Sequence, residues 1–222
     1  YHSIFRNSAA LCYDLVMASG TQFDEAPNKV SADYLETPFC VLNGFVANGP
    51  NVSPIFPKEY EASYAAALIA GEVSAKGQFA TIGGFPNDAM EKLLDVYEAV
   101  SVEVAKARGL SGANAVRAFD SSWENVALVK HVGETMIDNG ADTPFVYANQ
   151  VGNGSIQAAK EKGATFIGFS SNPNPIAPDT VVPSVSFDFE PFSVWPINTF
   201  SEGPPAGTMV NQPRPKEKNF HP

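Results

Sequence analysis

The chain has 222 residues, of which 44% are apolar and 17% are charged. This length and composition predict a globular protein with a sizeable core, in one large or two small domains, and they exclude a disordered chain. The formal net charge of −10 argues against nucleic acid and against an anionic membrane surface as partners. No apolar run approaches the roughly 18 residues of a membrane-spanning helix.

Apolar runs that alternate with helical patterns predict an α/β fold with a parallel sheet. The predicted strands cover residues 11–18, 38–42, 78–82, 115–119, 145–147, 165–169 and 181–187, with a short one at 207–210. Helical periodicity predicts helices at residues 59–74, 89–107 and 123–139. Capping boxes are predicted at Asp88 with Glu91 and at Ser121 with Glu124, and helix stops at Gly140 and Gly163.

The two cysteines, Cys12 and Cys40, each fall in or beside a predicted strand. The first interpretation is two buried thiols that pack as small apolar side chains. A disulfide between adjacent strands is the alternative. Metal binding is remote, because no histidine lies near either cysteine.

The segment 145–190 has the layout of a small-molecule site. Two predicted strands, 145–147 and 165–169, are each followed by amides, glycines or hydroxyls, and a predicted helix lies between them. Ligands of open parallel sheets bind beyond the carboxyl ends of the strands. The residues after these strands are therefore predicted to contact a ligand.

The sequence of this segment resembles that of the basic membrane protein (Bmp) family of ABC-transporter solute-binding proteins, which includes bacterial purine-nucleoside receptors. The similar stretches are GNGSIQAAKEKG at 152–163 and APDTVVPS at 177–184. Further similar pieces follow in family order, namely YDLVMASG at 13–20, PNV at 50–52, IGGFP at 82–86 and DNGAD at 138–142.

The resemblance implies the periplasmic-binding-protein type I architecture, with two doubly wound parallel-sheet lobes that close on a ligand. Residues 1–77 would form the first lobe, completed by about 187–205, and residues 78–186 would form the second lobe. Residues 206–222 are predicted to be an extended tail. The first lobe is expected to be incomplete, because the family's opening strand and helix precede the first residue of this chain.

The resemblance also implies a function. The chain is expected to be an extracytoplasmic receptor of an ABC importer, in the periplasm or lipid-anchored at the outer face of the membrane, with the anchor outside this chain. A small neutral ligand, with a purine nucleoside or nucleobase favoured, would bind in an interlobe cleft, and the permease would be the protein partner. A sugar receptor and a ligand-sensing regulator on the same fold are the alternatives.

No catalytic function, cofactor or metal is predicted, because the sequence has no nucleophile elbow, P-loop, zinc motif or C-x-x-C. His131 is expected to be an ordinary helix residue. Asp120 ends a predicted strand and is a weaker polar candidate, and Trp195 is an aromatic one.

The predicted ligand contacts are polar or glycine residues at strand ends and two aromatic residues: Ser19, Gly20, Asn43, Phe85, Asn149, Gln150, Gly152, Asn153, Ser170, Ser171 and Phe187. The plain alternative is that the polar ones shape turns and the aromatic ones pack in the core. Nucleoside receptors of the family carry an acidic residue where Ser170 and Ser171 stand, and a lysine near Phe187. The pocket is therefore expected to be neutral, with amides and hydroxyls.

Overall fold

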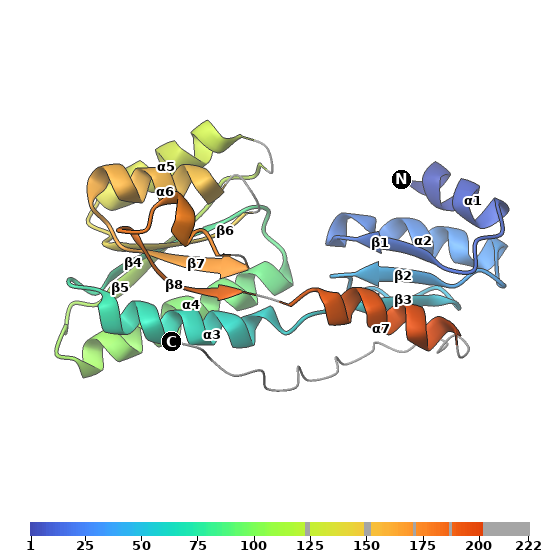
Figure 1. Cartoon of the computed structure of the whole chain (residues 1–222), viewed down its shortest axis with the longest axis horizontal. Helices are drawn as coiled ribbons and strands as arrows, with labels where there is room; N and C mark the ends of the chain where they lie inside the picture. The colour runs from blue at the N-terminus through green and yellow to red at the C-terminus, as the bar shows by residue number, and fades with distance from the viewer. Residues whose placement is uncertain (123–124, 149–151, 171, 187, 202–222) are drawn as a thin grey trace. The chain divides into compact units, whose positions relative to one another are not determined.

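The computed structural model describes residues 1–122, 125–148, 152–170, 172–186 and 188–201 (Figure 1). The contacts within the chain divide it into two units, Tyr1–Lys58 with the segment from Asp188, and Glu59–Phe187. Each unit holds parallel strands covered by helices, which confirms the predicted α/β class.

The first unit contains a parallel sheet of order β1-β2-β3. Its strands are β1 (Val16–Ser19), β2 (Phe39–Leu42) and β3 (Val52–Ile55). Its helices are α1 (His2–Ala10), η1 (Thr21–Phe23), α2 (Glu25–Val30), η2 (Ser31–Asp33) and α7 (Glu190–Ser201). Helices α1 and α2 cover one face (Figure 1), where Phe5 and Val30 pack with Phe39 of the central strand.

The predicted strand at 11–18 is wrong over its first half. The chain turns after α1, Leu11 is 69% exposed, and β1 begins only at Val16. Cys12 lies in this turn, exposed and with a φ of 56°. The prediction of a buried thiol is therefore wrong for Cys12 and confirmed for Cys40 on β2, and both thiols are free, which excludes the disulfide.

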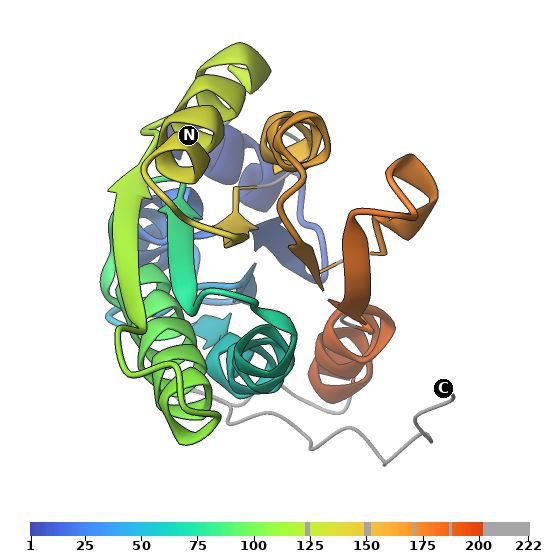
Figure 2. The same ribbon diagram turned by 90° about the vertical axis from the view of Figure 1, so that its left-hand side faces the viewer.

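The second unit contains a three-stranded parallel sheet of order β5-β4-β6 and a two-stranded pair β7-β8. Its strands are β4 (Gln78–Gly83), β5 (Asn114–Phe119), β6 (Thr143–Tyr147), β7 (Phe166–Ser170) and β8 (Val181–Ser186). A backbone hydrogen bond of 2.9 Å from Thr165 N–H to the Asp142 carbonyl joins the starts of β6 and β7. Figure 2 shows the strands of this unit side by side in one layer.

Helices cover both faces of the second unit's sheet, α3 (Glu59–Val73) with α4 (Asp88–Ala107) on one face, and α5 (Val126–Asp138) with α6 (Asn153–Lys162) on the other (Figure 1). The short helix η4 (Asn174–Ile176) lies between β7 and β8. Phe79 of β4 packs beneath α3 and α4, whereas Ile82 packs beneath α5 and α6. Burial on both faces explains why β4, β6 and β7 are mostly apolar along their length.

Helix α3 belongs to the second unit because its side chains pack there. The Ser63 hydroxyl donates a hydrogen bond of 2.7 Å to the Leu93 carbonyl of α4. A Cβ on Gly71 would meet the Val104 Cβ at 2.5 Å, so the two helices cross closely. The boundary between units therefore falls after Lys58, earlier than residue 77, where the first lobe was expected to end. The predicted tail and the strand at 207–210 lie outside the described residues.

Both predicted capping boxes are wrong, and both predicted helix stops are confirmed. Asn87 caps α4 in place of Asp88, by accepting a 3.0 Å hydrogen bond from Met90 N–H. Asn125 caps α5 in place of Ser121, which has a φ of 52°. An amide side chain is as good an N-cap as the predicted residues. Asp88 is already the first helical residue of α4, and Ser121 lies several residues before α5 begins at Val126. The stops at 140 and 163 are glycines with φ values of 112° and 70°.

Candidate functional site

The carboxyl ends of the second unit's strands form one candidate site, which we call the second-unit edge. The central strand β4 has β5 on one side and β6 on the other. The connecting helix α4 covers one face and α5 the opposite face (Figure 1). In a doubly wound sheet, ligands bind outside the carboxyl ends of the strands where the winding changes direction. Here that position lies beyond β4 and its two neighbours.

Backbone hydrogen bonds hold these strand ends together. Gly84 N–H donates to the Tyr147 carbonyl at 3.3 Å, and Asp120 N–H donates to the Gly83 carbonyl at 3.0 Å. Ser170, which ends β7, has a φ of 69°, a conformation that non-glycine residues adopt rarely and that concentrates at functional sites. The second-unit edge is therefore a fixed arrangement rather than a set of loose loop ends.

Two buried carboxyl groups lie at the second-unit edge. Glu59, in the first turn of α3, is 5% exposed and accepts a hydrogen bond from the Tyr147 side chain. Burial raises the pKa of Glu59 to about 7, although this hydrogen bond opposes the shift. Asp120, directly after β5, is 6% exposed, and burial raises the pKa of its carboxyl too. The expectation of a neutral amide-and-hydroxyl pocket did not include either group.

The two oxygens of Asp120 differ. Its Oδ1 accepts a 3.0 Å hydrogen bond from Ser122 N–H, whereas its Oδ2 is buried and has no hydrogen-bond partner. Sequence reasoning gave Asp120 only a minor place and missed Glu59 altogether. Asp120 could be predicted as a site residue because it directly follows a strand. No local sequence pattern predicts that Glu59 is buried.

The carboxyl ends of the first unit's strands form the first-unit edge. Ser19 ends β1, Gly20 follows it, and Asn43 follows β2. Gly20 N–H donates to the Leu42 carbonyl at 2.8 Å, and Asn43 N–H donates to the Ile55 carbonyl at 2.7 Å. The structure thus brings these three predicted residues together. Asn43 has a φ of 60°, and its side-chain oxygen is buried without a partner.

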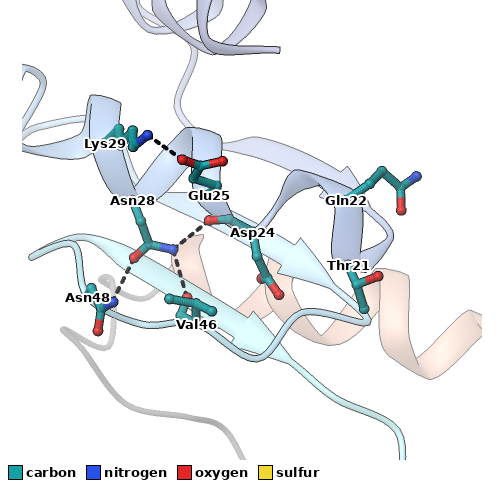
Figure 3. A pocket seen from close by; sticks show the side chains of 8 residues that line it. All are labelled: Thr21, Gln22, Asp24, Glu25, Asn28, Lys29, Val46 and Asn48. Carbon is teal, nitrogen blue, oxygen red and sulfur yellow. Dashed lines mark hydrogen bonds and ion pairs between the residues drawn. The ribbon is translucent and has the colours of Figure 1, made fainter. Parts of the chain in front are cut away.

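A pocket of about 490 Å³ lies next to the first-unit edge (Figure 3). It is lined by Thr21, Gln22, Asp24, Glu25, Asn28, Lys29, Val46 and Asn48. Sequence reasoning missed this pocket, whose lining begins at Thr21, directly after the predicted contact Gly20. An exposed ion pair joins Lys29 to Glu25 at its rim.

Two polar side chains of this pocket, Asn28 and Asp24, hold the loop after β2 in place. The Asn28 amide donates to the Asp24 carbonyl at 2.7 Å and to the Val46 carbonyl at 2.9 Å, and its oxygen accepts from Asn48 N–H at 2.7 Å (Figure 3). The Asp24 carboxylate accepts from Phe45 N–H at 2.9 Å. Burial raises the pKa of Asp24 even though the hydrogen bonds to the loop lower it. These two side chains position the loop.

The remaining predicted contacts fall at the second-unit edge or outside the described residues. Phe85, after β4, is 40% exposed, Gly152 and Asn153 begin α6, and Ser170 ends β7. Asn149, Gln150, Ser171 and Phe187 lie outside the described residues. A smaller pocket of about 240 Å³ beside β7 and β8 is lined by Asn172, Asn174, Val182, Ser184 and Ser186.

Other candidates have structural roles. Gly154 lies where α6 crosses α5, because a Cβ there would meet the Val126 carbonyl oxygen at 2.3 Å. His131 is an exposed residue of α5, as predicted, and Trp195 is half-buried in α7. Among the described residues, no group of three or more metal-binding side chains occurs. Over the same residues, no helix has both the length and the apolarity needed to cross a membrane.

Solved structures share this fold. An ABC-transporter solute-binding protein from Aeropyrum pernix K1 superimposes with a TM-score of 0.84 at 20% identity, over 94% of this chain and 60% of its own. A transcriptional activator of the comK gene from Bacillus halodurans gives 0.71 at 17% identity, over 91% and 68%. A sugar ABC-transport substrate-binding protein from Bordetella parapertussis 12822 gives 0.68 at 14% identity, over 96% and 69%. At these identities the likeness establishes the fold alone.

The chain spans 60% of the length of the Aeropyrum pernix protein. No curated protein sequence matches it. The family model of PnrA-like ABC-transporter substrate-binding proteins, Bmp, matches residues 1–194. Because that match covers most of the sequence and includes every stretch that resembled the family, the chain belongs to the Bmp family of ABC-transporter substrate-binding proteins.

Proposed function

We propose that this protein is the extracytoplasmic receptor of an ABC importer, which binds a small solute and delivers it to a permease. The observation that carries the proposal is the family match over residues 1–194. The absence of a predicted catalytic motif agrees with a protein that binds its ligand without chemistry. Selection would come from hydrogen bonds and aromatic contacts at the carboxyl ends of the parallel strands.

We propose a purine nucleoside or nucleobase as the ligand. Two buried acceptors without partners lie at the strand ends, Asn43 Oδ1 in the first unit and Asp120 Oδ2 in the second. Purines and riboses carry N–H and O–H donors that such acceptors bind, and Phe85, which follows β4, is a predicted aromatic contact for a planar base. The predicted contacts at 149, 150, 171 and 187 remain part of this proposal.

Two alternatives each have one supporting observation. A sugar would satisfy the same acceptors through its hydroxyls, and the Bordetella parapertussis neighbour is a sugar-transport protein. A ligand-sensing regulator is supported by the likeness to the comK activator. ATPase stimulation separates transport from sensing, because only a receptor that carries its ligand to the permease should stimulate that permease in proteoliposomes.

A thermal-shift screen of the full chain against nucleosides, nucleobases and sugars tests the ligand class. A ligand at a hundredfold excess over its dissociation constant stabilises the folded state by about 2.7 kcal/mol. For a chain of this size that corresponds to an increase in Tm of roughly 5–10 °C. A shift with sugars and none with purines would contradict the purine assignment and leave the receptor role standing.

A further inference from the structure

Four buried side-chain atoms of the described residues have no hydrogen-bond partner: Asn43 Oδ1, Asn51 Oδ1, the Tyr97 hydroxyl and Asp120 Oδ2. Tyr97 is a residue of α4 whose side chain lies in the core, where its ring stacks on Phe145 with the ring centroids 4.1 Å apart. Asn51 precedes β3, at the end of the sheet opposite the first-unit edge. Asp120 is the acidic member of this set, and it lies at the second-unit edge.

The local turn provides a hydrogen-bond donor for only one of the two carboxyl oxygens of Asp120. Oδ1 accepts the 3.0 Å hydrogen bond from Ser122 N–H, two residues along the chain, which is the usual way an aspartate closes a turn. Asparagine would serve that turn equally well. Oδ2 takes no part in it, and no ion pair within the described residues reaches this carboxyl.

A buried acceptor without a hydrogen-bond partner lowers the stability of the folded protein. A buried polar atom without a partner costs about 1–3 kcal/mol, and more when the group is charged. Proteins therefore seldom leave such atoms unpaired, except where a ligand, an ion or a bound water supplies the missing donor. Asp120 lies directly beyond β5 and is bonded through its N–H to Gly83, the last residue of the central strand β4. That is the position where doubly wound sheets hold their ligands.

We infer that Asp120 Oδ2 accepts a hydrogen bond from an N–H or O–H group of the bound solute, and that Asp120 therefore selects ligands that carry a donor at this point. On the purine assignment, that donor is an N–H of the base or an O–H of the ribose. This inference rests on the proposed receptor function and adds a carboxyl acceptor to a pocket that the sequence predicted to hold only amides and hydroxyls.

Substitution of Asp120 by Asn separates ligand recognition from structure. The variant keeps an oxygen for Ser122 N–H and places an NH₂ donor where Oδ2 stood, opposite the ligand's own donor. Its thermal stability should be unchanged or higher, because an uncompensated buried carboxyl is removed. Its affinity should fall by about tenfold to a hundredfold, the usual value of a hydrogen bond to a charged group.

The experiment is calorimetric titration of the full-length chain with adenosine, purine riboside, guanosine, inosine, D-glucose and D-galactose. The control is Asp142→Asn, which changes a partly buried carboxyl at the opposite end of the sheet, where Ala75 N–H, Lys76 N–H and the Ser74 hydroxyl satisfy it at 2.8 Å each. Asp142→Asn should lower stability and leave affinity unchanged. Asp120→Asn should lower affinity by at least about tenfold and leave stability intact.

Equal affinity of wild type and Asp120→Asn for every probe that binds would overturn the inference and leave the proposed function standing. If no probe bound to the wild type, the proposed solute assignments would fail, and the inference with them. A crystal structure with the tightest probe gives an independent readout. A probe nitrogen or oxygen within about 3.2 Å of Oδ2 supports the inference, whereas a water or protein group in that place contradicts it.

Discussion

Replacement of Glu59 by Gln should stabilise the protein at neutral and alkaline pH. The Glu59 carboxyl is buried in the first turn of α3, and burial raises its pKa to about 7 from an ordinary value of 4.5. The folded state therefore binds a proton that the unfolded chain releases between these two pH values. The contribution of this carboxyl to stability is fully present below about pH 4.5, declines as pH rises, and is lost above about pH 7.

The magnitude follows from the same two pKa values. Their difference, at 1.36 kcal/mol per pH unit, corresponds to about 3 kcal/mol of unfolding free energy. Glutamine retains an oxygen that can accept the Tyr147 hydrogen bond, and it does not ionise. The Glu59→Gln protein should therefore lack this part of the pH dependence while it keeps the packing of α3.

The assay is urea denaturation of both proteins, followed by circular dichroism, between pH 4.5 and 8.5. Subtracting the two stability curves cancels all other titrating groups, so the remainder should favour the variant by about 3 kcal/mol more at pH 8 than at pH 4.5. Glu91→Gln, which changes an exposed carboxyl in the first turn of α4, is the matched control. A difference between wild type and Glu59→Gln that does not change with pH would refute the buried-carboxyl reasoning.

Three further predictions concern the framework of the site. Asp142→Ala removes the acceptor for two backbone N–H groups and one hydroxyl and should lower the unfolding free energy by about 2–4 kcal/mol in the same assay, whereas an unchanged value would contradict the role of these bonds. Gly154→Ala places a methyl group 2.3 Å from the Val126 carbonyl oxygen and should cost about 1–3 kcal/mol; a neutral result would mean that α5 and α6 separate freely. A thiol reagent such as DTNB should modify the exposed Cys12 readily and Cys40 only on unfolding, because burial raises the pKa of Cys40 to about 12; comparable rates for the native protein would contradict the burial of β2.

The second unit was more predictable than the first, for reasons that particular residues show. Strands β4, β6 and β7 are mostly buried apolar runs, whereas β5 and β8 are largely half-buried or exposed. The ends of all five were predicted to within two residues. In the first unit, β3 was not predicted, because its Pro54 argues against a strand. Proline is tolerated here because β3 is an edge strand of its sheet. Helix α7 was not predicted either, because it contains two prolines. Pro191 lies in its first turn, where no N–H is required, and Pro196 is the buried residue of the helix.

The sequence by itself determined the alternating α/β fold and the family. Both depend on patterns within contiguous stretches of the chain, such as 138–142, 152–163 and 177–184. It also predicted that the strand ends would carry the site, since parallel strands bring their carboxyl ends to one edge. Only the tertiary structure decided which groups there are buried and which lack a partner. Burial and pairing depend on residues far apart in the chain, as when Tyr147 meets Glu59 or when Asp120 lies beside the end of β4. The edge expected to be neutral thus holds two buried carboxyls, one of them with an oxygen open to a donor.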